Sequence, residues 1–223
     1  MVYFCPNQTC RRMPSKQFRI NDTGSTLGLR WQWGYKHTQL RYNGELFGSV
    51  ANKAELQQGR TFALPEHGLL GIQLVGRLTP RLSLQLNGTE LESSPAHPKN
   101  VLSQAAYTLY FLGGLAVLVG LLAEVLAMNT LSALGYGWPT ALYGSCLAVL
   151  GVGVAKGRAW AVWLSIGLLL LDLAAAFYFA GQTEGGSFST AGLLIRMGVV
   201  YQLYEASLAV RELRVKELSR QPA

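Results

Sequence analysis

An acidic and a basic residue interrupt two apolar segments in the second half of the 223-residue chain. Asp172 lies within residues 159–181 and Arg196 lies within residues 188–210. A charge near the middle of a lipid bilayer is costly, so such residues pair with each other, face a protein interior or belong to a proton or ion pathway. These two residues are therefore the candidates for chemistry in this sequence, either as a structural ion pair or as part of a relay.

The spacing of Asp172 and Arg196 favours a direct contact. Each is about nine residues from the loop that joins the two segments, so at about 1.5 Å rise per residue both lie roughly 12–14 Å from the same membrane surface. We predict a bidentate salt bridge between them, with Gly192, one turn from Arg196, leaving space for it. A relay needs further ionisable groups in line, but Glu124 lies in another span and Glu205 turns to the opposite face of its helix. The sequence thus favours the structural role, which fixes helix register.

Four apolar stretches approach the roughly 20 residues that a membrane-spanning helix needs. They predict a C-terminal four-helix transmembrane bundle over residues 104–210, with spans near 104–126, 138–156, 159–181 and 188–210. Small residues recur in these spans at helical spacing, and in lipid such residues let helices approach closely. The predicted packing positions are Ala116, Gly120, Gly144, Ala148, Gly151, Ala155 and Ser165.

Basic residues indicate how the spans are oriented. Lys156 and Arg158 mark the turn between the second and third spans, the turn after the third span carries one acidic residue, and residues 211–223 form a basic tail. The positive-inside rule then places both termini in the cytoplasm, with the protein integral to the cytoplasmic (inner) membrane. The first residues lack the apolar core of a secretory signal, which agrees. Three Asn-x-Thr triplets in the front half favour an extracytoplasmic location in a glycosylating cell, the less favoured alternative.

The front half is predicted to form a cytoplasmic β-rich domain over residues 20–93, a small antiparallel β-sandwich or open barrel of six or seven strands. A flexible basic segment, 1–19, precedes it and a proline-containing linker, 94–103, follows it. Asn43-Gly44 and Asn87-Gly88 are predicted hairpin turns, because both central residues of a type I′ turn need positive φ. Their flanks, LRYNGELFGS and LQLNGTELESS, resemble each other and suggest a pseudo-repeat of two hairpins.

Cys5 and Cys10 are candidates for a metal site, but structural zinc takes four ligands and a second close pair is missing. Reduced cytoplasmic thiols are the favoured interpretation, so we predict no metal and no cofactor. Residues 1–100 hold 12 Lys and Arg against 6 Asp and Glu, which fits a domain beside anionic lipid better than a nucleic-acid-binding domain. Strand alternation also places Trp31 and Trp33 on the core side, away from nucleic acid.

Three segments of the back half resemble a group of uncharacterised bacterial four-span membrane proteins. They are YTLYFLGGLAVLVGLLAEVL, AVWLSIGLLLLDLAAAFYF and LLIRMGVVYQLYEASLAV, and the shared pattern is an Asp in the third span and an Arg in the fourth. The resemblance covers roughly the last half of the chain. It implies four spans and carries no activity with it.

The sequence contains neither a Gly-Lys-Ser/Thr phosphate loop nor an HExxH zinc motif, so no catalytic function is predicted. We expect a non-enzymatic integral membrane protein, a scaffold, assembly or adaptor module, whose partners are the bilayer and a second protein or a second copy of the chain. One alternative is a small transporter or channel with Asp172 and Arg196 in its pathway. A further alternative is a membrane-tethered nucleic-acid-binding domain.

Overall fold

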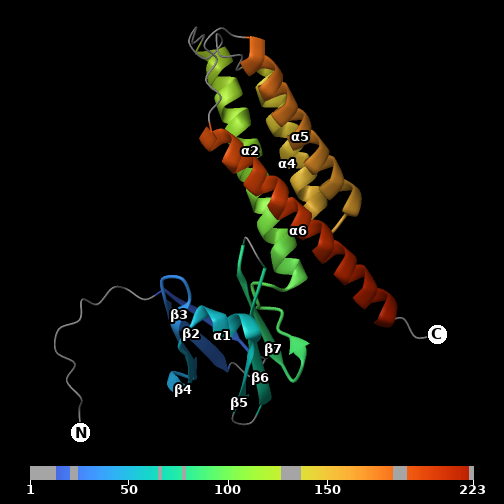
Figure 1. Ribbon diagram of the computed structural model, residues 1–223. Coiled ribbons are helices and arrows are strands. Elements are labelled where there is room, and N and C mark those ends of the chain that lie inside the picture. Colours follow the sequence, from blue (N-terminus) through green and yellow to red (C-terminus); the bar gives the residue numbers. More distant parts are fainter. Residues whose placement is uncertain are drawn as a thin grey trace, which may run out of the picture. The chain divides into compact units, whose positions relative to one another are not determined.

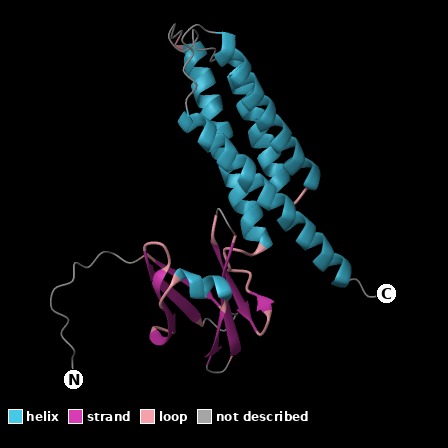
Figure 2. Cartoon of the chain, viewed as in Figure 1, coloured by secondary structure: helices cyan, strands magenta, loops and turns pink. Residues whose placement is uncertain are grey.

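The computed structural model describes residues 14–20, 25–64, 67–76, 79–126, 137–182 and 190–220. The chain divides into two compact units, Met1–His97 and Pro98–Ala223. The first unit is built from strands and the second from long helices (Figures 1 and 2). The change from polar to apolar sequence thus coincides with the boundary at His97.

Two four-stranded antiparallel sheets make up the first unit. Each is a meander, in the orders β1-β2-β3-β4 and β5-β6-β7-β8, and a short helix, α1 (Lys53–Gln58), lies between them in the sequence. The strands are β1 Ser15–Arg19, β2 Thr26–Gln32, β3 Lys36–Tyr42, β4 Glu45–Val50, β5 Arg60–Leu64, β6 Gly68–Val75, β7 Arg81–Leu86 and β8 Thr89–Glu90.

The two sheets share one hydrophobic core. Leu29 and Leu40 of the first sheet are buried in the same cluster as Ile72 and Leu84 of the second, and Leu56 of α1 joins them. Along β2 and β6 these buried positions alternate with more exposed ones, as expected for sheets that have one face on a core and one in water. The first unit is therefore a small antiparallel sandwich.

The two sheets use the same turn between their third and fourth strands. Asn43-Gly44 joins β3 to β4 and Asn87-Gly88 joins β7 to β8, and all four residues have positive φ, as a type I′ turn requires. Each Asn Oδ1 also accepts a hydrogen bond from a backbone N–H near the start of the second strand of its sheet. The donors are Thr26 at 3.0 Å and Leu69 at 2.8 Å.

The equivalence of the sheets extends beyond these turns. Gly28 on β2 lies opposite Arg41 on β3, and Gly71 on β6 lies opposite Gln85 on β7. Both glycines are flanked by buried apolar residues on the same strand. The repeat suggested by two similar hairpins therefore covers three strands of each sheet.

The boundaries of the first unit differ from those expected. Within residues 20–93 the described residues form seven strands, β2 to β8, as predicted, together with the unpredicted helix α1, and an eighth strand, β1, precedes this range. The strand β1 lies within the segment 1–19 that is expected to be flexible. It is held by pairing with β2 and by Phe18, whose side chain is buried in the shared core.

The predicted linker 94–103 is also wrong, because both of its ends belong to folded elements. The Ser94 hydroxyl accepts a hydrogen bond from the Leu84 N–H at 3.2 Å and donates one to the Leu82 carbonyl at 3.1 Å, which ties Ser94 to β7. The helix that follows begins at Pro98, since proline is well tolerated in the first turn of a helix.

Trp33 is exposed, contrary to the prediction that it faces the core. The strand β2 ends at Gln32, and Trp33 lies in the following turn with 93% of its surface exposed. A register irregularity between Arg30 and Gln32 interrupts the alternation of side chains. Trp31 stays half-buried and stacks on Tyr35, with ring centroids 5.8 Å apart. Burial of Trp33 in the core therefore does not count against nucleic-acid binding by this domain.

Four long apolar helices make up the second unit. They are α2 (Pro98–Val125), α4 (Trp138–Ala155), α5 (Ala159–Gln182) and α6 (Thr190–Arg220), and each is long and apolar enough to cross a membrane. Both α2 and α5 pack against α4 and α6, so the four helices form a closed ring of neighbours that alternate in direction (Figure 1).

The helix α6 continues past the expected end of the fourth span. Its 31 residues are about 46 Å long at about 1.5 Å per residue, which exceeds the roughly 30 Å of bilayer hydrocarbon. Residues 211–223, expected to be a tail, are therefore helical as far as Arg220. Leu, Arg, Lys and Glu predominate there, and all four favour helix.

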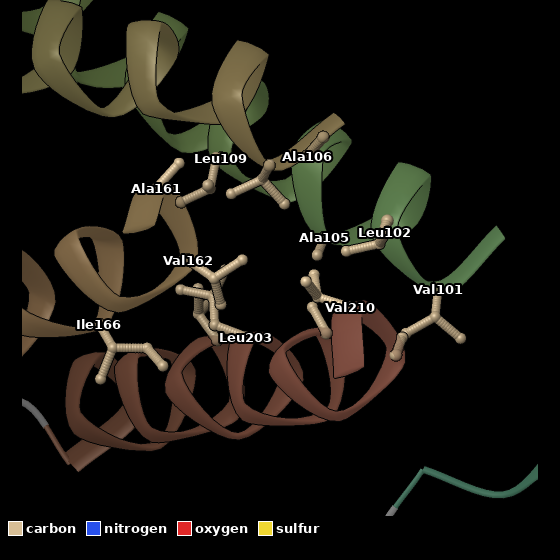
Figure 3. Packing of buried hydrophobic residues seen from close by; sticks show 14 of the residues in the cluster. Val101, Leu102, Ala105, Ala106, Leu109, Ala161, Val162, Ile166, Leu203 and Val210 are labelled. Atoms are coloured by element: carbon tan, nitrogen blue, oxygen red, sulfur yellow. The ribbon is translucent and has the colours of Figure 1, made fainter. Parts of the chain in front are cut away.

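A core of small and branched apolar residues runs through the bundle. Figure 3 shows how Ala105 and Leu109 of α2, Ala161 and Val162 of α5 and Leu203 of α6 meet in it. All five are buried. Outward-facing leucines, by contrast, are exposed on every one of the four helices, as expected where the solvent is hydrocarbon.

Candidate functional site

The structure brings Asp172 of α5 and Arg196 of α6 together. Arg196 Nε lies 2.8 Å from Asp172 Oδ2, and the two side chains are 35% and 30% exposed, respectively. This distance is that of a charge-assisted hydrogen bond. The pair is therefore in contact within the bundle, and about a third of the surface of each side chain stays accessible from outside it.

The pair lies at the end of the apolar seam between α5 and α6. One turn away on each helix are Leu169 and Val199, which belong to the buried core. Two turns away on α5 is Ser165, which is fully buried and donates its hydroxyl to the Ala161 carbonyl at 2.8 Å. Asp172 thus continues the inward face of α5, and its contact with Arg196 connects α5 to α6 at this end of the seam.

Tyr143 of α4 adds a third polar group to this site. It is half-buried and packs against the bundle core, near enough to Asp172 and Arg196 for their charges to act on its hydroxyl. Gly192, expected to leave space near Arg196, is half-buried on the same helix one turn earlier.

A second polar contact connects α2 to α6. The Thr108 hydroxyl lies 3.1 Å from Gln202 Oε1 and 3.1 Å from the Gln104 carbonyl. Gln202 is six residues beyond Arg196, about 9 Å along the helix. With Asp172 on one neighbour and Thr108 on the other, α6 is held by polar groups on both sides.

The closest helix contact in the bundle is the crossing of α2 and α4, and it depends on glycine. A Cβ at Gly113 would lie 2.6 Å from the Gly144 carbonyl oxygen, and one at Gly144 would lie 2.5 Å from the Gly113 carbonyl oxygen. Further along, a Cβ at Gly120 would lie 2.6 Å from the Ala141 nitrogen. The backbones of α2 and α4 therefore approach each other closely here, and such close packing drives the association of helices in lipid.

The other predicted packing positions have different environments. Ala116 and Ala148 line the α2–α4 crossing, and Gly151 lies under the Tyr110 ring. Ala155 is exposed and does not pack. The contact of α4 with α5 is made instead by Gly153, where a Cβ would lie 2.5 Å from the Ala161 Cβ.

The turn between α4 and α5 fixes where α5 begins. Gly157 has φ of +69°, its N–H bonds the Val154 carbonyl at 2.9 Å, and the Arg158 N–H bonds the Gly153 carbonyl at 3.1 Å. These two bonds form a Schellman motif, which ends a helix at a glycine. The turn therefore allows α5 to begin at Ala159, soon after α4 ends at Ala155.

No chain of charged groups leads away from the ion pair in the parts of the helices that the structure describes. Glu124 is exposed at the end of α2, and no acidic or basic residue separates Arg196 from Glu205 on α6. The described residues also contain no cluster of three or more metal-binding side chains. Cys5 and Cys10 lie outside the described residues, and Cys146 is exposed.

Four residues that the structure places in these contacts are not predicted from the sequence. Gly113 is one of them, although it lies seven residues before the predicted Gly120, a spacing that keeps one helix face. Thr108 and Tyr143 give no such signal, because hydroxyl-bearing residues are common in spans. Gly153 is not predicted because Gly151, two residues earlier, fits the small-residue spacing with Ala155.

Comparison of the chain with protein-family models, with curated proteins and with solved structures finds no match. The geometry of the site therefore carries the functional interpretation.

Replacement of Gly113 by Leu is expected to destabilise the bundle by about 1–3 kcal/mol, because the new side chain forces α2 and α4 apart. Gly114→Leu is the matched control, since a Cβ at Gly114 meets nothing within 4 Å. Free energies of unfolding measured in mixtures of SDS and mild detergent check this. Equal losses in the two variants would show that the α2–α4 crossing is not the close contact described.

The ion pair is expected to show a coupling free energy of about 1–2 kcal/mol in a double-mutant cycle of Asp172→Asn and Arg196→Gln. Each single variant leaves one charge unpaired in the bundle, so the double variant is expected to lose less stability than the sum of the losses in the two single variants. The same unfolding assay measures all three variants. A second cycle, Thr108→Val with Gln202→Leu, serves as the control, and its neutral contact is expected to give about 0.6 kcal/mol. Losses of unfolding free energy that are additive for Asp172 and Arg196 would contradict a stabilising interaction between α5 and α6 at this pair.

Proposed function

We propose that the chain is a non-enzymatic membrane scaffold or adaptor, in which the four-helix unit anchors the β-sandwich and binds a partner within the membrane. The observation that carries this proposal is the ion pair of Asp172 and Arg196, which is about a third exposed and forms no further ion pair among the residues that the structure describes. An isolated pair is suited to fix structure, whereas a pathway needs successive groups.

The exposed part of the pair supports association with another helix. At the depth of these residues the surroundings of a lone bundle are hydrocarbon, where charged groups are costly. The neighbouring Leu171 and Ile195 are also exposed, by 67% and 60%. A helix of a second copy or of another membrane protein that covers this face would shield the charges, and interhelical polar contacts in membranes favour such pairing.

A small transporter or channel is the second candidate, and one observation favours it. Tyr143 of α4 packs against the core that α5 and α6 share, and a polar group on a third helix is what a pathway between helices would use. The absence of any further charge between Arg196 and Glu205 on α6 favours the scaffold.

Self-association or partner binding is expected at the face that carries Leu171 and Ile195. In a chain with Cys5, Cys10 and Cys146 replaced by Ser, a photoactivatable cross-linker attached to the thiol of Leu171→Cys or Ile195→Cys in native membranes should give one discrete larger species on illumination. Leu142→Cys is the control, because Leu142 is 65% exposed on α4 beside Tyr143 and lies at a similar depth on another face.

A product of twice the mass identifies a second copy, and a product of any other discrete mass identifies a different partner. Cross-linking that is equally strong from Leu142→Cys, or absent from both test positions, would contradict the scaffold proposal. Cation or proton flux into proteoliposomes that disappears in Asp172→Asn would support the transporter instead.

We further propose that both termini face the cytoplasm. Lys156 and Arg158 are exposed at the α4–α5 turn, and Arg211 and Arg214 are exposed near the end of α6, which by the positive-inside rule is the cytoplasmic side. A periplasm-active reporter is expected to work when fused at Ser187 and to fail when fused at Ala223. The reverse pattern would invert the topology, and activity at both sites would contradict four spans.

A further inference from the structure

A groove between α5 and α6 lies away from the ion pair, toward the α4–α5 turn. Its volume is about 360 Å³, which is within the range of small-molecule sites. The lining residues from α5 are Ala159 and Trp163, and those from α6 are Tyr204, Ser207, Leu208, Val210, Arg211 and Arg214. The groove is therefore built from the first turns of α5 and one stripe of α6, at the opposite end of the seam from Asp172.

The floor and the mouth of this groove differ in chemistry. Ser207 and Val210 are buried and form the floor. Trp163 and Tyr204 are 59% and 50% exposed and form apolar walls with polar edges. Arg211 and Arg214 are exposed and three residues apart on α6, so they lie on one helix face. The groove thus changes from apolar to cationic along α6.

The change from apolar to cationic residues along α6 is expected to coincide with the boundary between the hydrocarbon and the headgroups of a bilayer. With Arg196 roughly 13 Å below the outer surface, Tyr204 lies about 25 Å and Arg211 about 35 Å from that surface at about 1.5 Å per residue. The hydrocarbon is about 30 Å thick. Tyr204 is therefore expected just inside the opposite boundary, where aromatic residues are enriched, and Arg211 at the level of the headgroups.

Among the residues that the structure describes, no acidic residue lines the groove. The acidic residues nearest in sequence to these arginines on α6 are Glu212 and Glu217, and the side chain of Glu217 is outside those described. No ion pair engages Arg211 or Arg214 among the residues that the structure describes. Two guanidinium groups at headgroup level present several N–H donors to a phosphate, which arginine binds in a fork geometry.

We infer that this groove binds one anionic phospholipid from the adjacent leaflet, with its phosphate between Arg211 and Arg214 and the upper part of an acyl chain against Trp163 and Leu208. The charge of the mouth, the apolar floor and the depth of both agree with this occupant. The site is separate from the Asp172–Arg196 pair and does not depend on the scaffold proposal.

The test is lipid binding by the full-length protein in mild detergent, followed by native mass spectrometry. Phosphatidylglycerol is expected to form a one-to-one adduct at least about tenfold more tightly than phosphatidylcholine of the same acyl chains. Arg211→Gln with Arg214→Gln should weaken phosphatidylglycerol binding about thirty-fold, because two charges at headgroup level are lost.

Lys156→Gln with Arg158→Gln is the matched control, since it removes two charges from the same end of the bundle but outside the groove. The control should change binding by less than about threefold if the groove is the site. Equal weakening by both double variants would overturn the proposal in favour of diffuse attraction. Full competition by millimolar inorganic phosphate would overturn it in favour of a free-anion site. Because all four side chains are exposed, both double variants are expected to fold.

Discussion

The four helices are long and apolar enough to cross a membrane, and that property constrains how they can be held together. Within hydrocarbon there is no hydrophobic drive for one helix to join another, so contact between helices there comes from close packing and from polar groups that pair with each other. The structure uses each in a different place. Gly113 and Gly144 bring the backbones of α2 and α4 together, and the pair of Asp172 and Arg196 connects α5 to α6.

These two kinds of contact have different consequences for specificity. Backbone-to-backbone packing is strong but tolerates sliding, because many small residues offer similar surfaces. An ion pair in a medium of low polarity allows one register, since any displacement along the helix separates the charges. The contact of Thr108 with Gln202 adds a second fixed point on α6. The seam between α5 and α6 thus has the ion pair at one end and the groove at the other.

Much of this architecture could be predicted from the sequence. Apolar length gives the four helices, and the depth of Asp172 and Arg196 relative to their shared loop gives their proximity without any further information. The Asn-Gly pairs give the two hairpin turns, because few other sequences accept positive φ at both positions. In each case a strict local or geometric rule connects residue type to structure.

The rest depends on tertiary context. Trp33 is exposed because a register irregularity follows Arg30, and no residue type in the sequence predicts such an irregularity. Ser94 is tied to β7 by hydrogen bonds to residues about ten positions away, so a sequence that looks like a linker is part of the sandwich. The groove between α5 and α6 combines residues from two helices, and its arginines read in the sequence only as part of a basic tail.

The repeated plan of the two sheets has a consequence for how the sandwich forms. Each four-stranded meander has one apolar face, and neither can bury that face without the other. The two halves are in effect a dimer of one module whose subunits are joined by the short segment around α1. Such a tether replaces an association that depends on concentration by an intramolecular one, so the pairing of the two sheets does not depend on how many molecules are present.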